Sequence, residues 1–129
     1  MNNIVLVWIT NPSACSNIVK AGDKISKDLN AELMIASIQN TIRDNWDNTV
    51  NDLEILSNAA RNVNAELTVI YSDNIFESAV KTVRDVQPIA IVAGVPGDRN
   101  KNIFLEQLQS CAENSPIYTV DIHGNILKI

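Results

Sequence analysis

Short apolar runs of strand length alternate along the chain with longer segments in which apolar residues recur at helical spacing. Five runs are rich in Ile and Val and are nearly continuous: residues 4–9, 33–38, 67–71, 89–93 and 117–122. A continuous apolar strand is buried on both faces, which is typical of a parallel sheet covered by helices. The pattern therefore predicts five strands of an α/β fold.

The segments between the strands each place their apolar residues on one face of a helix. Four such stripes are present: Ile18, Gly22, Ile25 and Leu29; Trp46, Val50, Leu53, Ala60 and Val63; Ile75, Phe76, Ala79, Val80, Val83 and Val86; and Phe104, Leu108, Cys111 and Ala112. Asn74 and Glu77 have the spacing of a capping box at the start of the third helix. Pro88 and Pro116 end the third and fourth helices.

The resulting order is β-α-β-α-β-α-β-α-β, and right-handed crossovers make a doubly wound sheet the economical packing. We expect a mainly parallel, five-stranded sheet with helices on both faces. No linker or low-complexity segment divides the chain, which predicts a single domain over residues 1–129. The tetrapeptide Asn-Ala-Glu-Leu occurs at 30–33 and 64–67, each time between a helix and a strand. We interpret it as similar turn chemistry in two equivalent loops.

The tail after the fifth strand carries a turn signal, His123-Gly124-Asn125, followed by an apolar run over 126–129. This pattern predicts a short extra edge strand that folds back on the sheet. An exposed apolar edge strand tends to pair with something. The tail therefore either closes the sheet edge or makes a homodimer contact through the C-terminal strand region, and both readings stay open.

The composition supports a folded chain, since 46% of the 129 residues are hydrophobic. A net charge of -5 opposes binding to nucleic-acid backbone or anionic lipid. No run approaches the roughly 18 apolar residues of a membrane span, and the N-terminus lacks a signal-peptide pattern. Cys15 and Cys111 stand outside any CxxC spacing, as expected of reduced thiols. We expect a cytoplasmic protein with no nucleic-acid and no membrane partner.

Ligands of doubly wound sheets bind beyond the carboxyl ends of the strands, where the strand order reverses. After the first strand, Thr10, Asn11, Ser13 and Ser16 precede a helix. Their hydroxyls and the free backbone N–H groups could hold an anion. They could equally cap the helix, with Pro12 in its first turn.

A second candidate segment follows the fourth strand. Gly94 and Gly97 would let the backbone approach a ligand closely, and Arg99 and Lys101 could meet phosphate charge. A tight turn with solvated charges explains the same residues equally well. We carry both segments forward as candidate ligand-binding residues.

Catalytic motifs are missing from the sequence. It contains no GxSxG elbow, no P-loop and no GxGxxG after the first strand. His123 is the only histidine and is expected to be a turn residue, and with two separated cysteines it makes no zinc site. Trp8 and Trp46 fit a core or an interface better than a base-stacking platform. We expect no catalytic residue, no metal and no required cofactor.

Several segments resemble universal stress protein domains: Ile4-Val5-Leu6-Val7, the entry to the second strand at 29–33, Val86 to Gly94, and Pro116-Ile117-Tyr118-Thr119-Val120. The first forty residues are most similar to the universal stress domain of KdpD sensor kinases, with serines in the turn after the first strand. The resemblance implies the adenine nucleotide alpha hydrolase-like fold. It also implies a noncatalytic sensor or binding domain in stress or osmotic signalling.

ATP-binding members of that family share the signature Gly-x-x-Gly, nine residues, then Gly-Ser or Gly-Thr. Gly94 and Gly97 supply its first half, but Gln107-Leu108 stands where the second glycine would fall. The first strand also ends without the acidic residue that ATP-binding members commonly carry. The resemblance therefore implies that ATP is not bound in the usual way. The alternative is a member that binds AMP, ATP or a cyclic dinucleotide through residues 94–101.

Overall fold

The computed structural model describes residues 3–9, 16–39, 46–72, 74–94, 110, 115–121 and 123–128. Its elements follow the chain as β1 (Ile4–Ile9), α1 (Ser16–Asp28), β2 (Glu32–Gln39), α2 (Trp46–Asn62), β3 (Glu66–Tyr71), α3 (Ile75–Val86), β4 (Ala90–Gly94), β5 (Ile117–Val120) and β6 (Ile126–Lys128). Each predicted strand is present, with ends shifted by at most two residues. The predicted fourth helix lies outside the described residues except for Ser110, which is helical.

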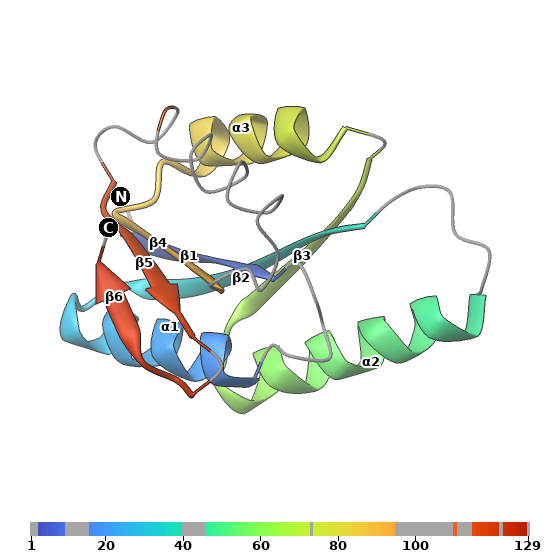
Figure 1. The fold of residues 1–129 in the computed structure, drawn as a ribbon, viewed down its shortest axis with the longest axis horizontal. Helices are drawn as coiled ribbons and strands as arrows, with labels where there is room; N and C mark the ends of the chain where they lie inside the picture. The colour runs from blue at the N-terminus through green and yellow to red at the C-terminus, as the bar shows by residue number, and fades with distance from the viewer. Residues whose placement is uncertain are drawn as a thin grey trace.

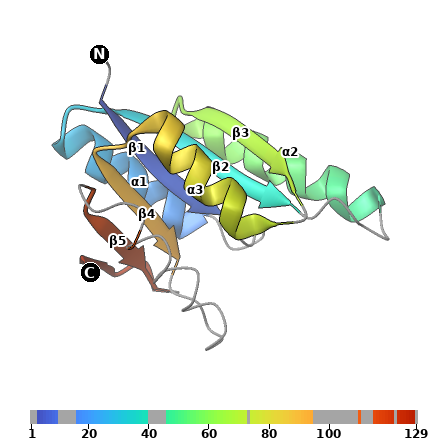
Figure 2. The same ribbon diagram turned by 90° about the horizontal axis from the view of Figure 1, so that it is seen from above.

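The strands form one sheet in the order β3-β2-β1-β4-β5-β6. Neighbours from β3 to β5 pair in parallel, and β6 pairs antiparallel with β5. Helices α1 and α2 cover one face of the sheet and α3 covers the other (Figures 1 and 2). The predicted α/β class and mainly parallel sheet are confirmed, and the C-terminal segment supplies the sixth, edge strand.

The centre of the sheet is β1, whose side chains alternate between two apolar layers. Val5, Val7 and Ile9 pack beneath α1 and α2, whereas Leu6 and Trp8 pack beneath α3. All five side chains are almost completely buried. Because helices cover both faces of the sheet at β1, no side chain of this strand faces solvent, and the strand is apolar at every position.

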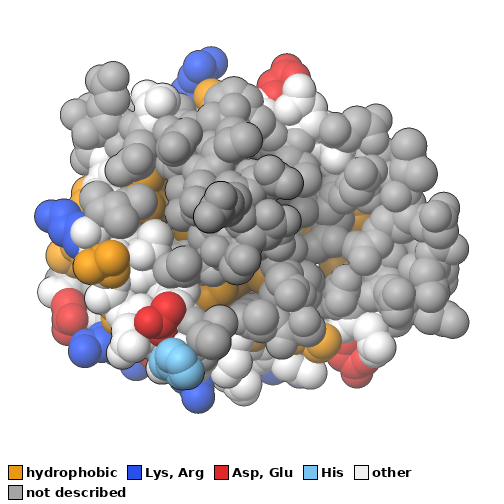
Figure 3. Space-filling view, in the orientation of Figure 1, with side chains coloured by type: hydrophobic (Ala, Val, Ile, Leu, Met, Phe, Trp, Pro, Cys, Tyr) orange, Lys and Arg blue, Asp and Glu red, His pale blue; other side chains and the backbone are white. Residues whose placement is uncertain are grey.

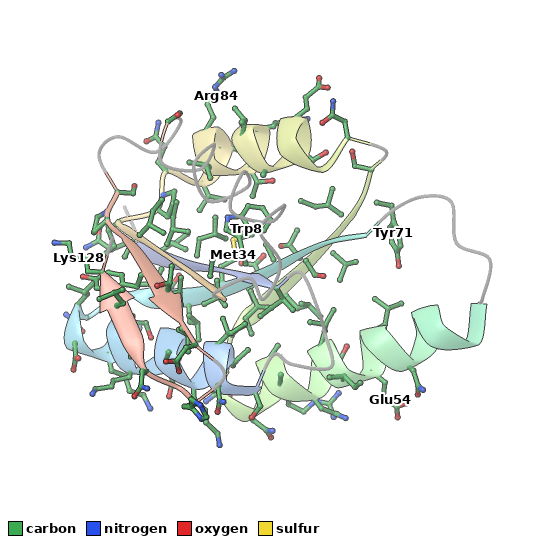
Figure 4. All side chains as sticks on the ribbon, viewed as in Figure 1. Trp8, Met34, Glu54, Tyr71, Arg84 and Lys128 are labelled. Atoms are coloured by element: carbon green, nitrogen blue, oxygen red, sulfur yellow. The ribbon has the colours of Figure 1, made fainter. Side chains whose placement is uncertain are left out.

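The indole of Trp8 occupies a space that its neighbours on the sheet leave open. Its register partners are Ala36 on β2 and Ala93 on β4, and all three are buried. Because these two alanines are small, the layer of side chains beneath α3 has room for the large indole of Trp8. Met34 lies close to Trp8 in this layer (Figure 4). The prediction that Trp8 belongs to the core is confirmed, and the side chain of Trp46 lies outside the described part.

Helix α1 approaches the sheet closely at Gly22. A Cβ atom at Gly22 would lie 2.4 Å from Cγ2 of Val7 on β1. A glycine at this point of the predicted apolar stripe is therefore required by packing rather than by backbone conformation.

The stripe ends earlier than its spacing predicts. Ile25 is buried, but Leu29 is 41% exposed. The helix ends at Asp28, and Asn30 then turns the backbone into the left-handed region, with φ of 55°. The prediction that Leu29 belongs to the buried face is wrong, because Leu29 lies beyond the last residue of α1 and is exposed.

The two Asn-Ala-Glu-Leu segments form the same loop. Asn30 and Asn64 both have φ of 55°. The N–H of Ala31 donates to the carbonyl of Ser26, and the N–H of Ala65 donates to that of Ala60. A second bond in each loop runs from the asparagine N–H to Lys27 or Arg61. Both are Schellman motifs with asparagine in the left-handed position, so the predicted similarity of the two loops is confirmed.

The ends of α3 match the signals in its sequence. The side chain of Asn74 accepts a hydrogen bond of 3.1 Å from the N–H of Glu77, which caps the first turn. At the other end Gln87 is left-handed, and its N–H donates to the carbonyl of Val83. Pro88 follows and cannot continue the helix.

Candidate functional site

The strand order reverses beside β1. The chain runs from β1 to β2 and β3 on one side, and β4 then pairs with the other side of β1 (Figure 2). In a sheet of this kind the carboxyl ends of β1 and β4 face a shared space in which ligands bind. Of the segments that the sequence singles out, the ones that begin at Thr10 and at Gly94 follow these two strands.

Gly94 marks the described end of β4, and α1 begins beside it. A Cβ atom at Gly94 would lie 2.8 Å from Cδ1 of Ile18, in the first turn of α1. Gly94 is not among the glycines with positive φ in the described residues. Close packing of α1 against β4 therefore accounts for this glycine, whether or not a ligand also uses it.

Of the eight candidate ligand-binding residues, two are described. Ser16 is the exposed first residue of α1, and Gly94 is half-buried at the end of β4. The fold brings Ser16 and Gly94 to the carboxyl edge of the sheet, because the first turn of α1 packs against the end of β4 through Ile18 and Gly94. Six others lie outside the described residues and stay predictions: Thr10, Asn11, Ser13, Gly97, Arg99 and Lys101.

A third segment at this edge was predicted only as a turn. It connects β5 to β6, and Gly124 in it has φ of 86°. A Cβ atom at Gly124 would lie 3.8 Å from the side-chain Cγ of Asn17, so the turn packs against the start of α1. Sequence reasoning identified Gly124 as a turn glycine, but nothing in the local pattern indicates that the turn meets α1.

Asp121 organises this turn. Its Oδ1 accepts hydrogen bonds of 2.9 Å from the N–H groups of His123 and Asn125, and its Oδ2 accepts one of 3.0 Å from the Asn125 side chain. The backbone N–H of Asn125 is the largest cause that holds the pKa of this carboxyl below its usual value. The Asp-x-His-Gly-Asn pattern was the available signal, since aspartate commonly bonds the backbone two residues on. His123 is an exposed turn residue, as predicted.

The described residues hold no group of three or more His, Cys, Asp or Glu side chains that could bind a metal. Within the same part of the chain no helix is long and apolar enough to cross a membrane. On the face drawn in Figure 3, the described charges of both signs are scattered rather than gathered into one basic patch. The described surface on this face thus offers no clustered cations for a nucleic-acid backbone.

No family model matches the chain, and no curated protein matches its sequence. Solved structures do match its fold. A universal stress protein in complex with cAMP superposes with a TM-score of 0.70 at 16% identity, over 94% of this chain and 98% of that one. The universal stress protein from Archaeoglobus fulgidus gives 0.69 at 15% identity, over 92% and 93%. The Archaeoglobus protein in complex with dAMP gives 0.62 at 16% identity, over 92% and 97%.

Enzymes share this fold too. N,N'-diacetylchitobiose deacetylase from Pyrococcus horikoshii superposes with a TM-score of 0.63 at 14% identity, over 92% of this chain and 60% of that one. At such identities the likeness is one of fold. The chain has the universal stress protein-like fold, and its activity has to be argued from its own residues.

Proposed function

We propose that the chain is a noncatalytic universal stress protein-like domain that senses or binds a small molecule in stress or osmotic signalling. The observation that carries the proposal is the carboxyl edge of the sheet where the start of α1, which includes Ser16, packs on Gly94 at the end of β4 through Ile18. The superposed universal stress proteins support the signalling role. A noncatalytic role rests on the lack of catalytic motifs in the sequence and on the exposed, turn-bound position of the only histidine. The proposed unit is one cytoplasmic domain over residues 1–129.

The ligand is the part of the proposal that needs direct measurement. Two superposed proteins were solved with cAMP and with dAMP, so adenine nucleotides are the first compounds to test. We propose that ATP is bound weakly or not at all, because the sequence lacks the second half of the ATP signature. The alternative is a nucleotide-binding domain that holds AMP, ATP or a cyclic dinucleotide with Gly94, Gly97, Arg99 and Lys101.

Thermal-shift titration of the full chain with ATP, AMP, cAMP and a cyclic dinucleotide separates these readings. A saturable rise in Tm with ATP, lost in a Gly97→Val variant that keeps its unliganded Tm, would establish the nucleotide-binding alternative. A shift with a cyclic dinucleotide alone would favour the likeness to the KdpD domain. If no nucleotide shifts Tm at millimolar concentration, the sensing domain acts through another ligand or through protein contacts.

Self-association through the C-terminal strand is also proposed. Strand β6 closes the edge of β5, and it presents Ile126 and Leu127, the latter 65% exposed, at the new edge of the sheet. Exposed apolar edge strands pair readily, which supports a homodimer at this edge. Sedimentation of the wild-type chain and of a Leu127→Lys variant tests it. A wild-type chain that stays monomeric at high concentration would leave simple edge closure as the role of β6.

A further inference from the structure

Strand β3 forms one end of the sheet, and β6 forms the other. Within the described residues no strand pairs with the outer side of β3, and its pairing with β2 runs without a bulge over six residue pairs. Proteins commonly block a free edge with lysine, proline or a bulge. Residues 66–71 contain no lysine and no proline, and Glu66 is the only charged residue among them. The described part of the chain therefore leaves the β3 edge open to another strand.

The side chains of β3 are less buried than those of the central strand. Residues 5–9 of β1 are at most 2% exposed, whereas residues 67–70 are half-buried and Tyr71 is 48% exposed. Leu67 and Val69 pack against the apolar layer on the side of α1 and α2. Since side chains alternate along a strand, Tyr71 shares their face, at the end of β3 (Figure 4). The edge thus presents partly exposed apolar side chains beside its free backbone.

A second copy of the chain fits this edge, because the sequence of β3 is self-complementary. A two-fold axis perpendicular to the sheet would pair two β3 strands antiparallel and join each face of one sheet to the same face of the other. Residues that lie opposite each other must then point to the same face, so their numbers differ by an even number. An axis at Val69 sets Val69 opposite itself, Leu67 opposite Tyr71, and Thr68 opposite Ile70.

This register joins apolar side chains and leaves the charge outside. The ring of Tyr71 would cover Leu67 of the second copy on the α2 side, and Ile70 would cover the methyl group of Thr68 on the α3 side. Glu66 would fall beyond the last of these pairs. An axis at Thr68 would instead set the carboxylate of Glu66 opposite Ile70, which costs desolvation. An axis at Ile70 would shorten the paired region.

We propose that the chain forms a homodimer through β3, in which two six-stranded sheets join into one continuous sheet. This interface is distinct from a contact at β6, which lies at the opposite end of the sheet. It also leaves the candidate ligand site accessible in each copy. Gly94 on β4 is three strands away from β3, about 14 Å at the usual strand spacing. The dimer therefore carries two separate ligand edges, and it does not depend on which ligand they hold.

Disulfide trapping tests the register. Cys15 and Cys111 are first replaced by serine, so that each variant of the full chain holds one cysteine. Val69→Cys should form a linked dimer under mild oxidation, because opposite residues of an antiparallel pair have Cα atoms about 4.5–5.5 Å apart. Tyr71→Cys is the matched control, because it is more exposed but would lie more than about 13 Å from its own counterpart. More linkage from Tyr71→Cys than from Val69→Cys indicates random collision and would overturn the proposal, as would linkage of neither.

Sedimentation separates this interface from a contact at β6. Leu127→Lys disables the β6 contact and should leave a dimer. Adding Tyr71→Lys should weaken that dimer by about tenfold or more, because it sets an ammonium group opposite Leu67, and lysine keeps edge strands apart. A monomeric Leu127→Lys variant beside a dimeric Tyr71→Lys variant would place the dimer at β6 and overturn the proposal. If each change alone yields monomers, β3 pairs with β6 of the next copy, and the proposal is again overturned.

Discussion

Ile18 occupies the position that a side chain on Gly94 would need: Cδ1 of Ile18 lies 2.8 Å from the place of the missing Cβ. The contact joins the first turn of α1 to the end of β4, which are the two described parts of the candidate site. The obstructing atom is the far end of a flexible side chain, so a single methyl group can be accommodated. We expect Gly94→Ala to cost about 1 kcal/mol and Gly94→Val about 2–3 kcal/mol of unfolding free energy.

Urea denaturation of a double-mutant cycle checks this contact. Ile18→Ala removes the obstructing atoms and loses their packing, but it makes room for the side chain at Gly94. The double variant Ile18→Ala, Gly94→Val should therefore be more stable than the sum of the single effects, by about 1 kcal/mol. Additive effects would mean that something other than Ile18 excludes a side chain at Gly94.

Gly22 poses a sharper steric test inside α1. Gly22→Ala raises helix propensity by about 1 kcal/mol, yet its methyl group would lie 2.4 Å from Cγ2 of Val7. Val7 is completely buried and stiff at χ1, so it cannot turn aside cheaply. We expect the steric overlap to outweigh the gain in helix propensity, so that a urea melt shows an unfolding free energy lower by about 1–2 kcal/mol. A stabilised Gly22→Ala variant would show that α1 moves off the sheet at little cost.

The fold could be predicted from the sequence because a strand that is buried on both faces has an apolar residue at every position. The run from Ile4 to Ile9 is apolar throughout, and the structure keeps those bounds. The cap at Asn74 was readable because capping depends on neighbours three residues away. Leu29 was misassigned because helical spacing does not report where the helix stops, and the left-handed turn at Asn30 decides that.

The candidate site was less readable, because it depends on contacts between segments far apart in the chain. Nothing local to Gly94 shows that Ile18 will pack on it, and nothing local to Gly124 points to Asn17. A glycine at the end of a strand can therefore be required either by a ligand that approaches the backbone or by a helix that packs against it, and only the fold distinguishes the two causes. For Gly94 the described structure shows the second cause, the packing of Ile18.

The paired loops at Asn30 and Asn64 should respond alike to substitution. Asparagine tolerates the left-handed conformation, whereas this conformation costs alanine about 1 kcal/mol and is not strained for glycine. We expect Asn30→Ala and Asn64→Ala to lower unfolding free energy by about 1 kcal/mol each, and the two glycine variants to be neutral or stabilising. Thermal and urea melts of the four variants check this. A loss at one loop alone would contradict their equivalence.

Asp121 should control how firmly β6 stays on the sheet. Within the described residues three residue pairs join β6 to β5, and all three residues of β6 are exposed. The Asp121 carboxylate holds the connecting turn through His123 and Asn125. We expect Asp121→Ala to increase amide hydrogen exchange in β5 and β6 at least about tenfold while α3 is unchanged. Exchange that rises equally in α3 would indicate global destabilisation instead.

The same carboxyl predicts a pH dependence confined to the hairpin. Hydrogen bonds in the turn, chiefly from the Asn125 N–H, lower the folded pKa of Asp121 from the ordinary value of 3.8. A group with a lowered folded pKa stabilises the fold fully above its unfolded pKa, and that contribution is lost as pH falls through the folded value. Exchange protection in β6 should therefore be constant above about pH 5 and fall at more acidic pH, once corrected for the intrinsic exchange rate. In Asp121→Asn, which cannot titrate, the acid-dependent loss should disappear, and its persistence there would assign the effect to another carboxyl.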